Sequence, residues 1–493
     1  MKRLFPIMCT LLLLYCPFGF AAIVWDGTSK APWTKGSGTE SDPYLIETPA
    51  NLAYLAEQVQ NGQTYEKTYF MQTNDIDLNN KRCQVGSSSS RCFWGIYNGG
   101  QKQVINVSGC LFGYIKSATI QNLTIAGTST YPMIKNANGN VTLINCHNKS
   151  ISKISGGGAG LVDIAEQGCI TLENCSNSAA ITSTYVDDTD KYVGGLVAKA
   201  DTIKINNCSN MGTLLLDGGL SAAHLYVAGL VGMVAEVGYI SNSFNNADIS
   251  IKGTYQQNGW YSIRSLNLSG LCGIYYSAKL VVNQSYVKWI KRDVSGYNDL
   301  YMSGISQGTT TYCYSIGEGI GYYNGISTNC YCILSKAEEK CVAGYLSVDI
   351  FYNSDVKIEN PYNAIAKTKD QMKSPSFVSL LNGEADYFYP DYTNINEGYP
   401  ILRWQLEGTT MYKIRATCPS AQGVVSGSGE YPATANITLK AIPKDGYAFT
   451  GWSDGNIDNP RTITVNGNAT YVAQFSQSAY TIYVNQDCTT DIE

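Results

Sequence analysis

Histidine and charge are both scarce in this chain of 493 residues. It has two histidines, and charged residues make up 15% of the sequence, with a formal net charge of −5. No run of lysine or arginine stands out, so nothing attracts a phosphate backbone, and nucleic acid is excluded as a partner. Lys/Glu-rich stretches are also few, whereas Val, Ile, Thr and Tyr are common, which argues against a helical protein.

A long apolar run is missing as well, and no segment is predicted to span a bilayer. The first 21 residues have a positive start at Lys2 and Arg3, a short apolar run and a small-x-small site ending at Ala21. This pattern predicts a signal peptide. Cys16 raises lipidation as an alternative, but the bulky Tyr15 before it favours secretory cleavage. We therefore predict an exported protein, either secreted or associated with an outer membrane or cell surface.

Paired C-x-x-C motifs are absent too, which argues against a zinc site. The chain has 16 cysteines, of which Cys9 and Cys16 fall in the signal peptide. Disulfides are permitted in an exported protein. Cys83 and Cys92 flank a serine-rich loop and are the predicted disulfide pair. No cofactor is predicted, and Ca²⁺ is the one metal that the sequence leaves open.

The most informative feature is a phrase that recurs down the middle of the chain. It opens with glycine and two apolar residues, as at 160–162 and 195–197, and closes with an Asn-Cys or Asn-Ser turn, as at 174–175 and 207–208. The steps between phrases range from 21 to 41 residues, so loops of different length interrupt a regular coil. Short β-branched segments between fixed turns predict strands. Together they predict a right-handed parallel β-helix, a pectin-lyase-like solenoid.

Helices are expected at both ends of the solenoid, where they would cover its apolar core. Thr48 is placed to cap a helix that starts at Pro49 and carries apolar residues on one face. Near the other end a helical stretch is predicted over residues 369–381. An edge-like strand is predicted over residues 399–404.

Residues after 410 form a different module, predicted to be a small all-β domain. Its strands are predicted at 412–416, 435–440, 447–452, 462–465 and 470–475. The predicted organisation is a signal peptide (1–21), a lead-in and N-terminal cap with the first coil (22–110), β-helix repeats (111–345), a C-terminal cap and linker (346–408), the β module (409–476) and the start of a second module (477–493).

The repeated phrase resembles the GLUG motif of large bacterial secreted and surface proteins, over roughly residues 44–404. The late phrases at 304–306 and 325–327 depart from the motif because they lack its leucine. The β module, through residues 446–452 and the later Tyr471-x-x-x-Phe475, resembles the bacterial B-repeat of an internalin surface protein. These resemblances imply export, surface display and often adhesion. They supply no catalytic residue that can be carried over.

The Asn-Cys turns are expected to have structural roles, because equivalent residues of a β-helix stack rung on rung. Stacking allows an inward ladder of amide hydrogen bonds along Asn145, Asn174, Asn207 and Asn242. Cys146, Cys175 and Cys208 would stack beside these asparagines. We interpret them as buried free thiols, and disulfides between rungs are the alternative.

Three carboxylates in one loop, Asp187, Asp188 and Asp190, are candidate Ca²⁺ ligands. The loop has no glycine at the tight-turn position and no spaced glutamate, so a solvated loop is the favoured interpretation. Asp454 and Asp458 are likewise interpreted as hairpin-turn residues in preference to cation ligands.

An enzyme is the main alternative to a binding protein. His147 and His224 have no motif around them, so a Ser-His-Asp site is not favoured. A polysaccharide hydrolase would need a histidine flanked by glycines, and a lyase would need an acidic Ca²⁺ groove with a base. Lys199, Asp201 and Lys204 lie close in sequence, but one such group does not make a groove.

Aromatic residues on late loops and rungs are candidates for stacking on sugar rings. The candidates are Trp260, Tyr261, Tyr275, Tyr276 and Trp289, and the same set includes Tyr322 and Tyr323 and, in the lead-in, Trp25 and Trp33. For each of them the alternative is packing of a loop onto the rod.

The predicted function is adhesion or ligand binding, without catalysis, by a surface-associated β-helix. The ligands would be glycans, or host or neighbouring proteins, contacted through the irregular segments between the repeated phrases. A carbohydrate-active β-helix enzyme and a spacer that projects another domain are the alternatives. The sequence leaves the oligomeric state open.

Overall fold

The structure, a computed structural model, describes residues 22–478 except 152, 156–157, 183–188, 218–221, 253–262, 275–277, 289–291, 296, 304, 306–307, 318–325, 335–346 and 359–362. The chain divides into two compact units, Met1–Ile350 with Ile358–Ala364 and Phe351–Lys357 with Ile365–Glu493. Within the described ranges, no helix is long and apolar enough to cross a bilayer. The signal peptide predicted over residues 1–21 lies outside the described residues.

Short elements at the start of the first unit precede the regular coils. They are β1 (Ile23–Val24), β2 (Tyr44–Ile46), α1 (Pro49–Gln60), β3 (Tyr69–Gln72) and β4 (Ile76–Asp77). Thr48 caps α1: its hydroxyl accepts from the N–H of Asn51, and the Asn51 side chain accepts from the N–H of Thr48. Leu52, Leu55 and Val59 of the helix are fully buried, so the predicted cap helix is confirmed.

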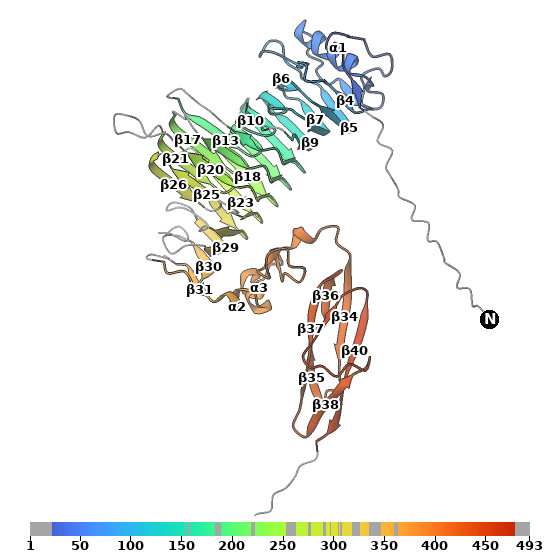
Figure 1. The fold of residues 1–493 in the computed structure, drawn as a ribbon, viewed down its shortest axis with the longest axis vertical. Coiled ribbons are helices and arrows are strands. Elements are labelled where there is room, and N and C mark those ends of the chain that lie inside the picture. The colour runs from blue at the N-terminus through green and yellow to red at the C-terminus, as the bar shows by residue number, and fades with distance from the viewer. Residues whose placement is uncertain are drawn as a thin grey trace, which may run out of the picture. The chain divides into compact units, whose positions relative to one another are not determined.

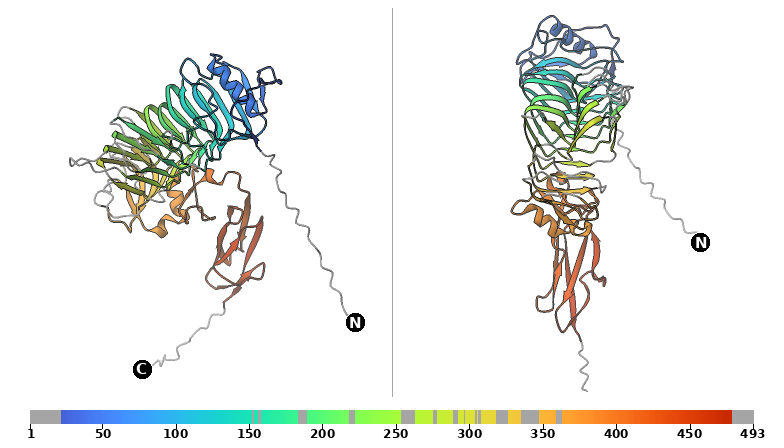
Figure 2. Two further views of the ribbon diagram at one scale, coloured as in Figure 1. Left: turned by 45° about the horizontal axis from the view of Figure 1, so that its top comes forward. Right: turned by 90° about the vertical axis from the view of Figure 1, so that its left-hand side faces the viewer.

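Parallel strands arranged round an axis form the rest of the first unit, as the predicted β-helix requires (Figures 1 and 2). The longest sheet contains β5 (Ile96–Ile105), β6 (Phe112–Lys116), β7 (Thr119–Ala126), β8 (Ile134–Asn138), β9 (Val141–Asn148), β10 (Val162–Glu173), β11 (Ser176–Asn177), β14 (Val197–Asn206), β15 (Ser209–Asn210), β18 (Val231–Ser241), β19 (Phe244–Asn245), β22 (Cys272–Ile274), β23 (Lys279–Asn283), β24 (Tyr286–Lys288), β27 (Thr309–Thr311), β28 (Tyr314–Gly317) and β29 (Ile326–Leu334). A second sheet contains β12 (Ile181–Thr182), β16 (Leu214–Asp217), β20 (Ile249–Lys252) and β25 (Arg292–Ser295). A third contains β13 (Lys191–Gly194), β17 (Ala222–Ala228), β21 (Ile263–Ser269) and β26 (Tyr297–Ser303).

The opening phrase sets the register between coils. The N–H of Leu161 donates to the carbonyl of Leu196 at 3.0 Å, and the N–H of Leu196 donates to the carbonyl of Leu230 at 2.9 Å. The next bond in the series, from Leu230 to Leu271, is also 2.9 Å. All four side chains are fully buried. The leucines that open successive repeats in the sequence therefore lie on consecutive rungs, which confirms the predicted repeat.

The glycine of the opening phrase makes room for a buried asparagine of the closing turn. A Cβ added to Gly195 would overlap both the side-chain amide of Asn210 and the carbonyl of Gly229. One coil earlier, Gly160 stands against Asn177 in the same way. Asn177 Nδ2 donates to Asn210 Oδ1 at 2.9 Å, so the amides form a ladder along the core. The two halves of the phrase are thus fitted to each other.

This inward ladder uses different asparagines from those predicted. Its members are Asn148, Asn177, Asn210 and Asn245, all with no exposed surface. Asn174 and Asn207, from the predicted column, have φ of 53° and 52° and are half-buried and exposed, respectively. Asparagine tolerates this left-handed conformation, and the reversal of the chain there leaves its side chain outside the core. The buried cysteine follows, and strand alternation then buries the asparagine two residues later.

The cysteine column has a hydrogen-bonding role. Cys146, Cys175 and Cys208 are buried and free, which agrees with the favoured interpretation. The N–H of Cys175 donates to Cys208 Sγ at 3.3 Å, and the N–H of Cys208 donates to Ser243 Oγ at 3.0 Å. A sulfur or a hydroxyl oxygen from the next rung thus satisfies the N–H of each turn. This shared role explains why cysteine and serine replace each other in the phrase.

The chain enters the second unit within β30. The first elements there are β30 (Val348–Asn353), β31 (Ile365–Lys367), α2 (Lys369–Met372), α3 (Pro375–Asn382), β32 (Phe388–Tyr389), β33 (Ile401–Leu402) and the 3₁₀-helix η1 (Arg403–Leu406). Thr368 caps α2, Ser374 caps α3, and Gly383 ends α3 with a φ of 56°, so the helical stretch predicted over 369–381 is confirmed.

One prediction for this region needs correction. The strand expected over residues 399–404 is reduced to β33, because the Gln405 side chain accepts from the N–H of Leu402 at 2.8 Å and starts the turn of η1. The segment 346–408 is divided between the two units, with most of it in the second, and its role as a C-terminal cap and linker stays a prediction. There the Tyr389 hydroxyl donates to the carbonyl of Glu430 at 2.6 Å, which joins this segment to the terminal module.

The terminal module has two small sheets around one core. Its strands are β34 (Met411–Thr417), β35 (Gly423–Ser426), β36 (Gly429–Pro432), β37 (Asn436–Pro443), β38 (Tyr447–Trp452), β39 (Arg461–Thr464) and β40 (Ala469–Gln477). The core includes Ile414, Leu439, Trp452 and Ala473. All five predicted strands are present, and β35 and β36 were not predicted. The second module expected from residue 477 falls almost entirely outside the described residues.

The buried amide ladder predicts a large effect for Asn177→Ala. The variant removes the bonds from Asn177 to both backbone groups of Ala179 and to Asn210, and leaves those buried groups unpaired. We expect a loss of about 2–4 kcal/mol, because buried polar groups without partners are costly. The measurement is the urea midpoint of β-sheet circular dichroism.

Asn207→Gly is the matched control for that substitution. Glycine accepts the positive φ of Asn207 and removes only an exposed amide contact. Its expected cost is about 0.5 kcal/mol. Equal losses for the two variants would contradict the inward position of the Asn177 column.

Candidate functional site

The predicted aromatic site lies outside the described residues. This holds for Trp260, Tyr261, Tyr275, Tyr276 and Trp289, whose role in ligand binding therefore stays a prediction. Trp33 is described, and it packs against Tyr44, Tyr54, Tyr65 and Phe70 in the N-terminal cap. Packing is thus the interpretation that fits Trp33.

The predicted calcium loop is described only in part. Asp187 and Asp188 lie outside the described residues, and Asp190 is half-buried just before β13. Among the residues that the structure describes, no group of three His, Cys, Asp or Glu side chains is arranged to hold a metal ion.

The predicted Cys83–Cys92 disulfide is not formed in the structure, where both thiols are free and buried. Cys92 Sγ instead donates to the carbonyl of Ser89 at 3.2 Å and accepts from Trp94 Nε1 at 2.8 Å. Burial raises the pKa of the Cys83 thiol to about 12, which keeps it neutral.

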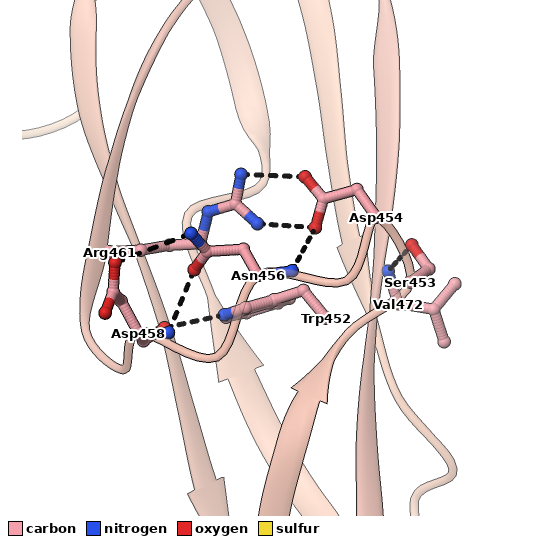
Figure 3. Close-up of polar contacts among 7 residues, drawn as sticks. All are labelled: Trp452, Ser453, Asp454, Asn456, Asp458, Arg461 and Val472. Carbon is pink, nitrogen blue, oxygen red and sulfur yellow. Dashed lines mark hydrogen bonds and ion pairs between the residues drawn. The ribbon is translucent and has the colours of Figure 1, made fainter.

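The turn of the terminal module that contains Asp454 and Asp458 is held together by hydrogen bonds and an ion pair (Figure 3). The carboxylate of Asp454 accepts from both terminal nitrogens of Arg461, at 2.7 and 2.8 Å, and the guanidinium lies over the ring of Tyr471. Trp452 Nε1 donates to the carbonyl of Asp458 at 3.0 Å. These contacts support the interpretation of Asp454 and Asp458 as hairpin-turn residues.

Both histidines contact a serine on the neighbouring rung. His147 Nδ1 lies 2.8 Å from Ser176 Oγ, and His224 Nδ1 lies 2.5 Å from Ser265 Oγ. Each pair occupies matching register positions on adjacent parallel strands, so the stacking of the coils alone accounts for the contact. Partial burial lowers the pKa of His147.

A tyrosine stack on the later coils is closed to ligands. Phe244, Tyr286, Tyr314 and Tyr331 stack with ring centroids 4.9, 4.8 and 5.2 Å apart, and the three tyrosines are buried. Such contacts stabilise the fold, at about 0.5–1.5 kcal/mol for each pair.

An open hollow lies on the first coils, and the sequence did not indicate it. It has a volume of about 470 Å³ and is lined by residues from three stretches, 82–87, 108–114 and 131–135. We call it the N-terminal groove. A second hollow of about 430 Å³ adjoins it and shares Arg82, Gln84 and Ser87.

Strand stacking brings the three stretches of the N-terminal groove together. Val85 bridges to Phe112 of β6, and Phe112 pairs with Ile134 of β8. These three side chains are fully buried, so they fix the backbone beneath the groove. The polar residues of the groove are therefore held by the rigid coil.

Two cations line the N-terminal groove, and they belong to different coils. Arg82 and Lys135 are exposed, and within the described chain neither forms an ion pair with a carboxylate. In the adjoining hollow, Lys30 is paired with Glu57 at 2.8 Å. The shared Arg82 is thus left as the uncompensated charge of both hollows.

Hydrogen bonds within the coil support the side chain of Arg82. Arg82 Nη2 donates to Gln84 Oε1 at 2.9 Å, and Gln84 Nε2 donates to the carbonyl of Gly86 at 2.9 Å. A Cβ on Gly113 would overlap the amide of Gln84, so the missing side chain there makes room for this support. The guanidinium keeps further N–H donors available for a ligand.

Tyrosines and a neutral thiol complete the N-terminal groove. Tyr131 is 37% exposed and Tyr114 is half-buried. Cys110 is buried, and its burial raises its pKa to about 12, so the thiol adds no negative charge. The groove therefore combines positive charge, two phenol rings and the hydroxyls of Ser87 and Ser108.

The Arg461–Asp454 pair predicts a pH effect on the terminal module. Arg461 lowers the pKa of Asp454 below its usual value. A lowered carboxyl pKa stabilises the fold above the unfolded value of about 3.9, and this stabilisation is lost as the pH falls through the folded value. Asp454 is 41% exposed, so solvent screening limits the gain to about 0.5 kcal/mol.

We expect Asp454→Asn to lower the melting temperature of the terminal module by about 2–4 °C at neutral pH, and the difference should vanish in strong acid. Scanning calorimetry at the two pH values measures both. Asp445→Asn, at an exposed position in the neighbouring turn, is the control and should change neither. A difference that persists in acid would exclude the charge pair as the cause.

Comparisons with known proteins agree with the module at the C-terminal end. Residues 412–479 match the sequence model of a family described as the divergent InlB B-repeat domain. This confirms the resemblance seen in the sequence for that part of the chain. The GLUG resemblance of the coils stays a prediction.

Two curated relatives are immunoglobulin A1 proteases. One, from Streptococcus sanguinis, is 26% identical over 209 residues, which are 41% of this chain and 11% of the relative. The other, from Streptococcus pneumoniae, is 25% identical over 209 residues, which are 41% of this chain and 10% of the relative. The chain thus spans about a tenth of the length of these relatives. The findings describe a bacterial surface-type protein that carries a B-repeat domain.

Proposed function

We propose that the protein is exported, displayed at a bacterial surface and binds an extracellular ligand without converting it. The N-terminal groove is the binding site. The observation that carries this proposal is the meeting of Arg82, Lys135, Tyr114 and Tyr131 around one open hollow on a rigid coil. Ligand sites typically combine a hollow of this size with a few convergent polar groups.

Two of the three groups that a polysaccharide lyase would use, Lys199 and Asp201, make other contacts, so we place an enzyme second. Lys199 Nζ lies 3.2 Å from Glu166 Oε1 and 5.7 Å from the centre of the Tyr192 ring. Asp201 accepts from the N–H of Gln167 at 2.9 Å. Lys199 is thus paired with an acid, whereas a lyase needs a base that is free to take a proton.

The similarity to the streptococcal proteases supports display and recognition. Proteolysis of immunoglobulin A1 is in the name of those proteins, and the matched segment is about a tenth of each. A segment shared with much longer proteins of this kind suits a role in recognition. The B-repeat domain supports the same role, since it would hold the coils away from the surface.

The proposal is tested with residues 22–493 on an array of glycans and extracellular proteins. We expect saturable binding to at least one class of ligand. Arg82→Gln and Lys135→Gln should each weaken it about 10-fold or more, because a hydrogen bond to a charged group contributes about 1.5–3 kcal/mol. Lys204→Gln, which removes an exposed cation on β14, is the matched control and should bind normally.

Turnover separates the two candidate functions. We expect no unsaturated product by ultraviolet absorbance, and no new reducing ends, when acidic polysaccharides are incubated with the protein and Ca²⁺. Turnover that EDTA abolishes, and that Lys204→Gln reduces, would replace the binding protein with a lyase.

A further inference from the structure

We infer that the ligand of the N-terminal groove is an acidic saccharide, that is, a sugar carrying a carboxylate or sulfate group. This inference rests on the function proposed above, and it adds the chemical class of the ligand. The anionic group would lie between Arg82 and Lys135, and the sugar ring would lie against Tyr131 and Tyr114.

Charge is the first argument. The chain has a formal net charge of −5, so its overall charge does not attract an anion. The N-terminal groove is an exception, because two cations line it and no carboxylate does. Asp163, in register with Lys135 on the next coil, is half-buried, accepts from the N–H of Gly158 at 2.8 Å and interacts electrostatically with Lys135 without forming an ion pair. An anionic ligand would supply the charge that the groove lacks.

Geometry at Arg82 is the second argument. Gln84 holds one end of the guanidinium at 2.9 Å, and Gly86 in turn holds Gln84. A guanidinium fixed in this way presents its other N–H groups as a planar fork, which binds the oxygens of a carboxylate or sulfate in pairs. Holding the fork in advance lowers the entropy that binding costs.

The remaining lining favours a sugar over other anions. Tyr131 exposes part of its ring, which offers an apolar face with a hydroxyl at the edge. Ser108 adds a hydroxyl of the kind that pairs with ring hydroxyls, and Ser87 adds an acceptor oxygen, because its hydrogen is donated to Gln60 Oε1. The volume of about 470 Å³ is suited to one or two sugar residues. An acidic peptide would match the cations but would leave these hydroxyl partners unused.

The test compares acidic and neutral members of matched sugar pairs by isothermal titration with residues 22–493. The pairs are trigalacturonate with galactotriose, sialyllactose with lactose, and lactose sulfate with lactose. We expect at least one acidic sugar to bind about 10-fold or more tightly than its neutral partner. Raising NaCl from about 50 to about 500 mM should weaken that binding, since the contact is ionic and partly exposed.

Variants locate the binding. Arg82→Gln and Lys135→Gln should each weaken acidic-sugar binding about 10-fold or more and remove most of the preference for the acidic sugar over its neutral partner. Arg82→Lys should keep part of the binding, because it retains the charge and loses the planar fork. Lys204→Gln should have no effect. Circular dichroism checks that each variant is folded, and all three positions are exposed.

The outcomes are distinct. Binding of a carboxylated sugar, a sulfated sugar or both, with loss in the Arg82 and Lys135 variants, supports the inference and shows which acid is preferred. Equal binding of neutral sugars, binding that ignores both cations, or binding of acidic peptides alone overturns the inference but leaves a binding protein. Saturable binding of no ligand of any class would overturn the proposed function itself.

Discussion

The fold depends on the fit between a glycine and an asparagine on stacked coils. Four consecutive coils bury an asparagine at the closing turn, and the amides of Asn177 and Asn210 each cap their own turn and bond to the next coil. The opening glycine of the same coil has no side chain, so that amide can approach the backbone. A larger residue at Gly195 would meet both Asn210 and a carbonyl of the next rung. Register, turn and core are therefore set by one contact repeated along the axis.

This constraint explains why residues with reactive side chains are poor guides to function here. Cys208 Sγ accepts a hydrogen bond from the N–H of Cys175. On the next coil Ser243 takes the same position, and its hydroxyl oxygen accepts from the N–H of Cys208. The histidines face serines because the register places them there. A ligand is better recognised by exposed polar residues that lie outside these regular columns. In the N-terminal groove, Arg82 and Lys135 are exposed and form no ion pair with a carboxylate of the described chain.

Much of the fold could be predicted from the sequence. The spacing of Leu161, Leu196 and Leu230 gave the coil register correctly, because each leucine fills the same core position. The predicted asparagine ladder was wrong because the backbone conformation of the turn decides which side chain points into the core. A left-handed turn at Asn174 moves the buried asparagine three residues along, which periodicity alone does not reveal. Similarly, the Gln405 side chain converts a predicted strand into a 3₁₀ turn.

The candidate site could not be predicted, for a related reason. Arg82, Tyr114 and Lys135 are separated by more than 20 residues each and follow no motif. They meet because three coils stack with short steps, whereas the sequence prediction placed ligand contacts on the longer segments between phrases. The sequence shows Arg82 and Lys135 as two isolated cations. Only the register, which places Val85, Phe112 and Ile134 on successive rungs, shows that the two cations lie in one groove.

The central claim is that the repeated phrase is scaffold and that recognition occurs at the N-terminal groove. The most direct measurement is hydrogen–deuterium exchange of residues 22–493 with and without a saturating acidic trisaccharide. Our account predicts protection confined to peptides covering residues 79–92, 108–116 and 131–138. Protection in residues 253–262 or 275–277, or along the Asn-Cys turns, with none at these three stretches, would contradict it.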